Sequence, residues 1–224
     1  GGLVSYLASS RIRIPDTPQG PDRGGRPLAQ RWSDYFGVVR SHPAFVRFLA
    51  KRFVFFSGSA LAVPLFPLYY VREVGASDAA IGTISMAQTI VLVFGYAVWM
   101  RVKSRRGAQF VLVVTTLSLS LYPALVAATT HVPFIVLLAG FAGVVSAGID
   151  LVFFDELMKT VPMEHSATFV SIAQSMQYTS SVLFPLIGTT LASVIGLSGA
   201  LVVAAAIRLA GALLFAFWRT ESSA

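Results

Sequence analysis

Residues 108–129, AQFVLVVTTLSLSLYPALVAAT, and residues 133–154, PFIVLLAGFAGVVSAGIDLVFF, are two adjacent apolar stretches that decide the fold class. A helix of this length rises about 33 Å, enough to cross the roughly 30 Å hydrocarbon core of a bilayer. Four further stretches of the same character flank them, at 53–71, 79–100, 167–189 and 196–218. We therefore predict an all-α membrane protein with six transmembrane helices joined by short connections.

The composition agrees with a membrane location. Of the 224 residues 55% are hydrophobic and 12% charged, and the mean hydropathy of +0.73 is too high for a soluble domain of this size. The net charge of +7 does not indicate nucleic acid, because the basic residues lie between the spans rather than along one face. With no Cys and three scattered His, we expect no metal site and no cofactor, and the lipid bilayer is the expected partner.

The segments outside the six spans differ from one another. Residues 1–8 look like the tail of a preceding transmembrane helix, and residues 219–224 form a short tail. Residues 9–52 are predicted to be a linker, rich in Pro, Gly and Arg at first and then amphipathic. Apolar residues in that second part recur at helical spacing, at Trp32, Tyr35, Phe36 and Val39. Such a helix would lie on the lipid headgroups or pack against the inner end of the bundle.

Lys and Arg gather on one side of the predicted membrane. Nine precede the first span, four lie in RVKSRRG at 101–107, and Lys159 and Arg219 follow on the same side. The opposite side carries Arg72. The positive-inside rule therefore predicts that the N- and C-termini are cytoplasmic.

A short internal similarity links the second and fifth spans. Residues 84–89, ISMAQT, are similar to residues 170–175, VSIAQS, and the acidic residues Asp78 and Glu164 precede them by the same interval. These two spans run in opposite directions, as in transporters built from inverted three-helix repeats. Chance similarity between two apolar helices is the alternative explanation.

Four stretches of the chain form a recognisable set: SHPAFVRFLAKRF at 41–53, the helix containing Pro64 and Pro67, GASDAAIGTI at 75–84, and DELMKTVPMEHSATFVSI at 155–172. Together they resemble the C-terminal six-helix half of a major facilitator superfamily transporter, and the match covers residues 41–218. The family's second connection carries Gly, an acidic–Arg pair and further basic residues. This chain keeps the basic part of that motif, without the Asp, in Arg101, Lys103, Arg105 and Arg106.

The resemblance implies secondary active transport of a small molecule by alternating access, in a bacterial inner membrane. It also implies a missing N-terminal six-helix half as a partner. Proton-coupled efflux, as an antiporter, is one form that this transport could take. A non-transporting membrane scaffold or receptor is the alternative function. An intramembrane protease is excluded because no span carries a His and only one carries an Asp.

Polar residues inside membrane spans are costly and usually face a cavity or another helix. In the fifth span such residues recur on one face, with Gln177 beside them, at Ser171, Gln174, Tyr178 and Ser181. Because the resemblance places this helix along the transport path, Gln174, Gln177, Tyr178 and Ser181 are candidate substrate contacts. Gln88 in the second span belongs to a shorter stripe of the same kind. The alternative for both stripes is hydrogen bonding between packed helices.

Asp150 and Arg208 are charges well inside predicted spans. Asp150 is a candidate for coupling to protons or another cation, and Arg208 for a supporting role. The alternatives are a structural ion pair between the two, or a carboxylate on the aqueous side.

Three other features concern the helices themselves. Pro64 and Pro67 predict a kink or a local opening of the first span. Tyr69 and Tyr70, near its outer end, are predicted to lie in the aromatic belt at the membrane surface, with contact to a ligand as the alternative. Small residues at a spacing of four predict close helix packing in the fourth span, at Ala139, Gly143 and Ala147.

Overall fold

The computed structural model describes residues 41–160 and 166–217, which belong to one compact unit, residues 39–224. The described residues are helical apart from short connections. Five of their helical stretches are long and apolar enough to cross a membrane, counting 43–72 as one stretch. The predicted stub 1–8, the amphipathic stretch at 32–39 and the tail 219–224 lie outside the described residues.

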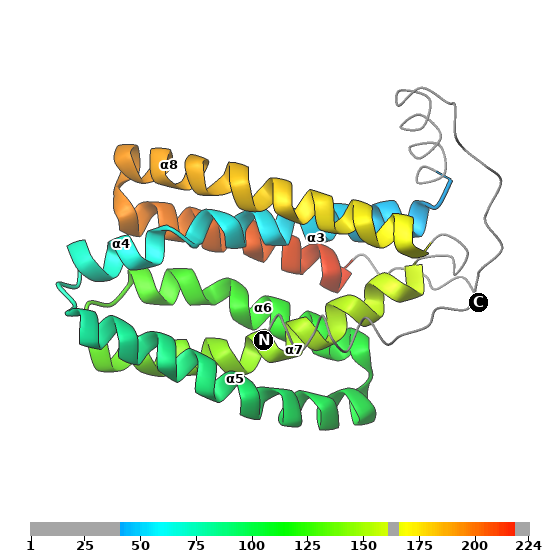
Figure 1. Cartoon of the computed structure of the whole chain (residues 1–224), viewed down its shortest axis with the longest axis horizontal. Helices are drawn as coiled ribbons and strands as arrows, with labels where there is room; N and C mark the ends of the chain where they lie inside the picture. The colour runs from blue at the N-terminus through cyan, green and yellow to red at the C-terminus, as the bar shows by residue number, and fades with distance from the viewer. Residues whose placement is uncertain (1–40, 161–165, 218–224) are drawn as a thin grey trace, which may run out of the picture. The chain divides into compact units, whose positions relative to one another are not determined.

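The helices, labelled as in Figure 1, follow one another with few residues between them. They are α3 (Pro43–Ala62), α4 (Leu65–Arg72), α5 (Asp78–Arg106), α6 (Ala108–Ala127), α7 (Val132–Thr160) and α8 (Ser166–Phe217).

The first span begins ten residues earlier than predicted and is broken in the middle. Pro43 occupies the first turn of α3, where a missing backbone N–H costs nothing, so residues 43–52 belong to the helix and not to the linker. The helix ends at Ala62 and restarts as α4 at Leu65. This interruption at Pro64 confirms the predicted opening.

The second span is also longer than predicted, since α5 continues from residue 100 to Arg106. Ser77 caps its start by accepting a hydrogen bond from the Ala80 N–H at 3.3 Å. Basic residues in its last turn interact favourably with the negative end of the helix dipole. Gly107, at φ 82°, ends the helix and starts α6. The predicted basic loop is therefore the last part of a helix.

Helix α8 contains one non-helical residue, Gly196, with φ 79° and ψ 166°. A positive φ of this size is readily available only to glycine, and it allows the chain to reverse without a loop. Figure 1 shows the first arm of α8, residues 166–195, and the second arm, residues 197–217, running in opposite directions. The first arm thus extends past the predicted end at residue 189.

The helices pack in two main pairings, α3 against α8 and α5 against α7, with α6 contacting both α7 and α8. Glycine makes these approaches close. A Cβ on Gly143 of α7 would overlap the backbone carbonyl of Gln88 on α5. Gly143 is buried, as are Ala139 and Ala147 with no exposed surface. The small-residue stripe is therefore a packing surface, as predicted.

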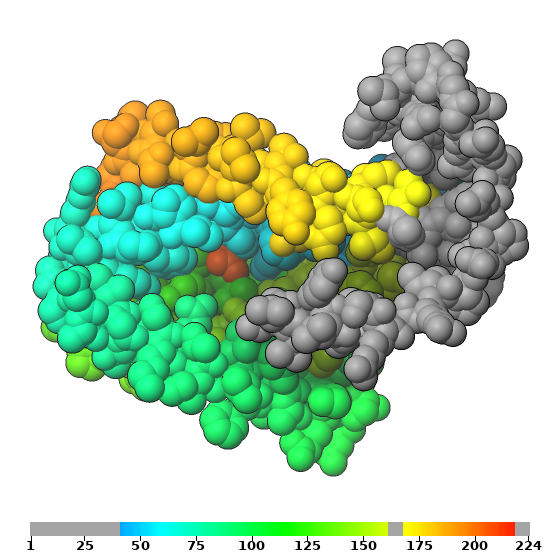
Figure 2. Space-filling model, in the orientation of Figure 1, coloured from blue at the N-terminus to red at the C-terminus, as the bar shows by residue number. Residues whose placement is uncertain are grey.

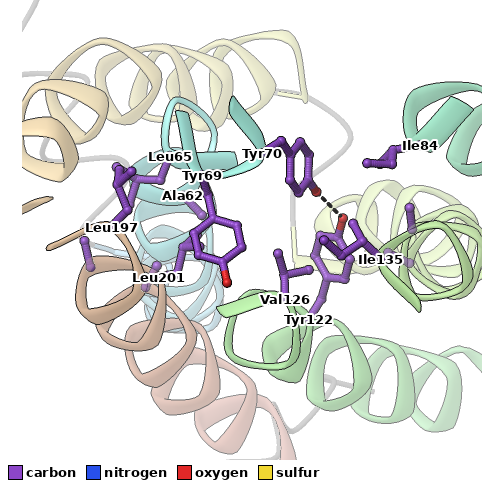
Figure 3. Packing of buried hydrophobic residues seen from close by; sticks show 14 of the residues in the cluster. Ala62, Leu65, Tyr69, Tyr70, Ile84, Tyr122, Val126, Ile135, Leu197 and Leu201 are labelled. Atoms are coloured by element: carbon purple, nitrogen blue, oxygen red, sulfur yellow. Dashed lines mark hydrogen bonds between the residues drawn. The ribbon is translucent and has the colours of Figure 1, made fainter. Parts of the chain in front are cut away.

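Tyr69 and Tyr70 are buried in the core and do not lie at the lipid-facing surface, so the aromatic-belt prediction was wrong. Their side chains are 2% and 5% exposed. Tyr69 Oη donates to the backbone oxygens of Ala127 and Thr129, at 3.3 and 3.1 Å, where α6 ends. The hydroxyls of Tyr70 and Tyr122 lie 3.2 Å apart (Figure 3). These partners satisfy the polar tips, so the rings can bury their apolar area.

Candidate functional site

The predicted polar stripe of the fifth span lies on an exposed face of the first arm of α8. Gln174, Tyr178 and Ser181 are all exposed, Tyr178 by 67%. Within the described residues, neither the Gln174 nor the Tyr178 side chain has a hydrogen-bond partner, and Ser181 Oγ donates to the carbonyl of Gln177 in its own helix. These side chains do not join packed helices here, so their polar groups are available to something outside the described unit.

The corresponding stripe of α5 is less polar. Gln88 is half-buried and its backbone contacts α7 at Gly143. Thr89 Oγ1 donates to the carbonyl of Ser85 at 2.9 Å. The surface around them is apolar and exposed, at Met86, Ile90, Val93, Phe94, Val98 and Met100. Over an apolar stretch of 18 residues within α5, only 11% of the residues are buried within the described structure.

Gln177 takes part in a polar contact between α3 and the first arm of α8. Arg52 Nη2 donates to Gln177 Oε1 at 2.5 Å. The guanidinium lies over two aromatic rings, with its carbon 5.2 Å from the centroid of Phe56 and 5.7 Å from that of Phe153. Arg52 Nε is buried and has no hydrogen-bond partner among the described residues. A small hollow, open on one side and with room for about one water molecule, adjoins this group.

Sequence reasoning missed Arg52 because it counted this residue among the basic residues flanking the first span. The signal that could have found it is the SHP sequence at 41–43, since proline favours the first turn of a helix. A helix starting there puts Arg52 nine residues inside, or about 14 Å along the axis.

Asp150 and Arg208, expected as a possible ion pair, do not pair. Asp150 is exposed and its Oδ2 accepts a hydrogen bond from Tyr96 Oη at 3.1 Å. Arg208 is 5% exposed, with its guanidinium carbon 5.2 Å from the ring centroid of Phe55. Its Nε has no hydrogen-bond partner among the described residues. The positions of the two residues within their spans suggested depths in the membrane at which they could pair. Their side chains instead lie on helix faces that point to different neighbours.

The four basic residues of the predicted loop motif have separate surroundings at the end of α5. Lys103 forms an ion pair with Asp155 near the end of α7. Arg101 Nη1 donates to the Ala97 carbonyl in its own helix, at 3.3 Å. Arg106 lies over the ring of Phe110, at 4.9 Å, and Arg105 is exposed. The motif therefore joins α5 to α7 through one ion pair.

Figure 2 shows a broader recess on one face of the unit, with α3 on one side and the green helices on the other. The second arm of α8, in red, is visible at its floor. Across the described ranges, no three His, Asp or Glu side chains are grouped to bind a metal ion. The candidate site therefore consists of amides, hydroxyls and one guanidinium, which can recognise a ligand by hydrogen bonds and charge.

Comparison with known proteins identifies one relationship. Residues 48–224 match the family model described as Major Facilitator Superfamily. No curated protein matches the chain, and no solved structure matches it.

Proposed function

The chain belongs to the Major Facilitator Superfamily, and from this premise we propose that it moves a small molecule across a membrane by alternating access, as one six-helix half of a transporter. Membership of this family implies secondary transport and a non-enzymatic protein. The observation that carries the proposal is the exposed polar stripe on the first arm of α8, a helix otherwise apolar enough to cross the bilayer. Lipid tails cannot satisfy amide and phenol groups, so such a face belongs against water, substrate or protein.

The proposed half consists of six spans in two inverted three-helix units. The first unit is α3 with α4, then α5 and α6, and the second is α7 with the two arms of α8. In these two units α3 corresponds to α7, and α5 corresponds to the first arm of α8. The pairing of α3 with the first arm of α8 in one unit order therefore corresponds to the pairing of α7 with α5 in the other. Glycines support both pairings: a Cβ on Gly188 would lie 2.5 Å from the Leu61 carbonyl oxygen, and one on Gly95 would lie 2.9 Å from that of Val144.

The second half of the transporter would cover the exposed faces of α5 and of the first arm of α8. Both helices belong to the membrane by their hydropathy, and both are poorly covered on the face that carries their polar stripe. Substrate would then bind between the halves near the midplane, against Gln88, Gln174, Gln177, Tyr178 and Ser181.

The cytoplasmic side would be the one with the Lys103–Asp155 ion pair, the beginning of α3 and the end of α8. Asp150 is the proposed coupling carboxylate, because it is exposed and hydrogen-bonded to Tyr96 rather than neutralised by Arg208. Efflux in exchange for protons across a bacterial inner membrane is the corresponding reaction. Transport by the Asp150→Asn variant should no longer respond to an imposed pH gradient, and an unchanged response would remove this role.

Flux of labelled compounds through membrane vesicles containing the intact protein tests the proposal. We expect Gln174→Ala and Tyr178→Ala to lower flux strongly. Thr190→Ala is the matched control, since Thr190 is exposed on the same arm and its hydroxyl donates to the Leu186 carbonyl at 2.9 Å. Equal flux for all three variants would contradict the site. Specific binding without any flux would favour a receptor.

A further inference from the structure

Arg52 is a charged group within a stretch that is long and apolar enough to cross the membrane, residues 43–72. Placing an unpaired charge there is costly, so an arginine in this position normally has a partner of opposite charge. Across residues 41–160 and 166–217, no carboxylate forms an ion pair with Arg52. The basic side chains of Lys103 and Lys159 differ, because each pairs with an acidic residue of α7.

The hydrogen bonds of Arg52 are incomplete as well. A guanidinium has five N–H donors, and the described residues provide one acceptor, Gln177 Oε1. Its Nε is buried and unsatisfied. The rings of Phe56 and Phe153 hold the planar group in place without using its donors. The guanidinium is thus held in place while most of its N–H donors have no acceptor among the described residues.

The space next to Arg52 has a distinct chemical character. The hollow is bounded by α3 and the first arm of α8, and its wall is mainly apolar, including Leu49, Phe53 and Met176. Its polar wall comes from Arg52, Gln177 and Ser180. Arg208 has a similar unsatisfied Nε, but it is enclosed between Phe55 and Gly58 and does not line this hollow.

We propose that the substrate is an organic anion with an apolar or aromatic body, whose carboxylate or phosphate group is bound by Arg52 while Gln177 holds the guanidinium in position. A planar guanidinium forms paired hydrogen bonds with either oxyanion. Apolar residues at the small hollow beside Arg52, Leu49, Phe53 and Met176, then contact the part of the molecule next to its charged group. This inference rests on the proposed transport function, since it names the substrate class of the same site.

The test is a binding measurement on the intact protein, purified in a neutral detergent. The probes are 2-naphthoate and 2-naphthyl phosphate, with uncharged 2-naphthamide as the matched neutral compound. Wild type should bind at least one anionic probe, with naphthamide much weaker. Arg52→Gln should weaken binding of the anion by about tenfold to 100-fold, the value of a charge-assisted hydrogen bond. Arg47→Gln is the control, because Arg47 lies on the same helix and its Nε donates to the Pro43 carbonyl.

Gln177→Glu provides a second test that does not depend on removing the cation. The new carboxylate would occupy the position of Gln177 Oε1 and pair with Arg52. If Arg52 recognises substrate, this variant should fold normally and lose binding of the anions. If Arg52 only joins α3 to α8, Gln177→Glu should bind as wild type does, which would overturn the proposal. Equal binding of naphthoate and naphthamide, or no binding of either anion, would also overturn it.

An anionic lipid headgroup offers the same oxyanion, so the assay needs a lipid arm. Proteoliposomes are compared with and without phosphatidylglycerol, and uptake of the bound probe is measured in both. Uptake that depends on Arg52 in both preparations supports the proposal, and loss of probe binding whenever phosphatidylglycerol is present would overturn it. Arg52-dependent binding without uptake of any probe would instead refute the transport function and leave the anion site in place.

Discussion

Replacing Gly143 by alanine tests the closest approach between two helices, α5 and α7. The added Cβ would overlap the backbone carbonyl of Gln88, and a backbone cannot rotate away as a side chain can. Overpacking of this kind typically costs about 1–3 kcal/mol. Because alanine is about 1 kcal/mol better than glycine in a helix, the net loss is smaller than the overlap alone would give.

Gly140→Ala is the matched control on the same helix. The nearest atom to its added Cβ would be Val91 Cγ2 at 3.8 Å, an ordinary contact. This variant should therefore be neutral or up to about 1 kcal/mol more stable than wild type. The expected difference between the two variants is about 1–3 kcal/mol. Equilibrium unfolding of the purified protein in mixed micelles measures it, and equal stabilities would refute the described packing of α5 against α7.

Three further predictions concern stability and are measured by the same unfolding assay. Tyr70→Phe and Tyr122→Phe should each lower the free energy of unfolding by about 1–3 kcal/mol, because each leaves the other hydroxyl unpaired in the core. The double variant should lose less than the sum of the two, and strict additivity would contradict the hydroxyl contact. Gly196→Ala should cost about 1–3 kcal/mol, because its φ of 79° and ψ of 166° lie in a region that only glycine adopts readily. Gly82→Ala, in open helical surroundings, should not destabilise, and equal effects would argue against the reversal at Gly196. Lys103→Ala should cost at most about 1 kcal/mol, since its ion pair is partly exposed, and a much larger loss would mean that the pair is buried in the membrane.

The apolar spans could be predicted from the sequence because membrane hydrocarbon imposes both length and composition on a helix. The ends of these spans could not be predicted. The basic residues Arg101 and Lys103 predicted a loop, yet helix hydrogen bonding and the helix dipole favour continuing α5 through them. Gly196 shows the opposite case, where one residue with a positive φ reverses the chain and no loop composition marks the position.

The polar stripe of α8 could be predicted because helical periodicity alone decides which residues share a face. Contacts between helices could not be predicted in this way. Arg52 and Gln177 are 125 positions apart in the chain, and only the packing of α3 on α8 brings them together. The same limit explains Asp150 and Arg208, whose depths in the membrane were compatible with an ion pair although their helix faces were not.

The central claim, that the polar stripe faces an alternating aqueous pathway, is tested most directly by single-cysteine accessibility. The chain has no native Cys, so Gln174→Cys introduces a unique thiol within it. Leu183→Cys is the control, because Leu183 is 51% exposed and nine residues away, half a turn round the same helix. A membrane-impermeant maleimide is applied to one side of sealed vesicles at a time, with and without a transported probe. The account predicts that position 174 reacts, that the transported probe changes which side reaches it, and that position 183 stays unreactive. Equal reactivity at both positions, or labelling at 174 that no transported compound alters, would contradict it.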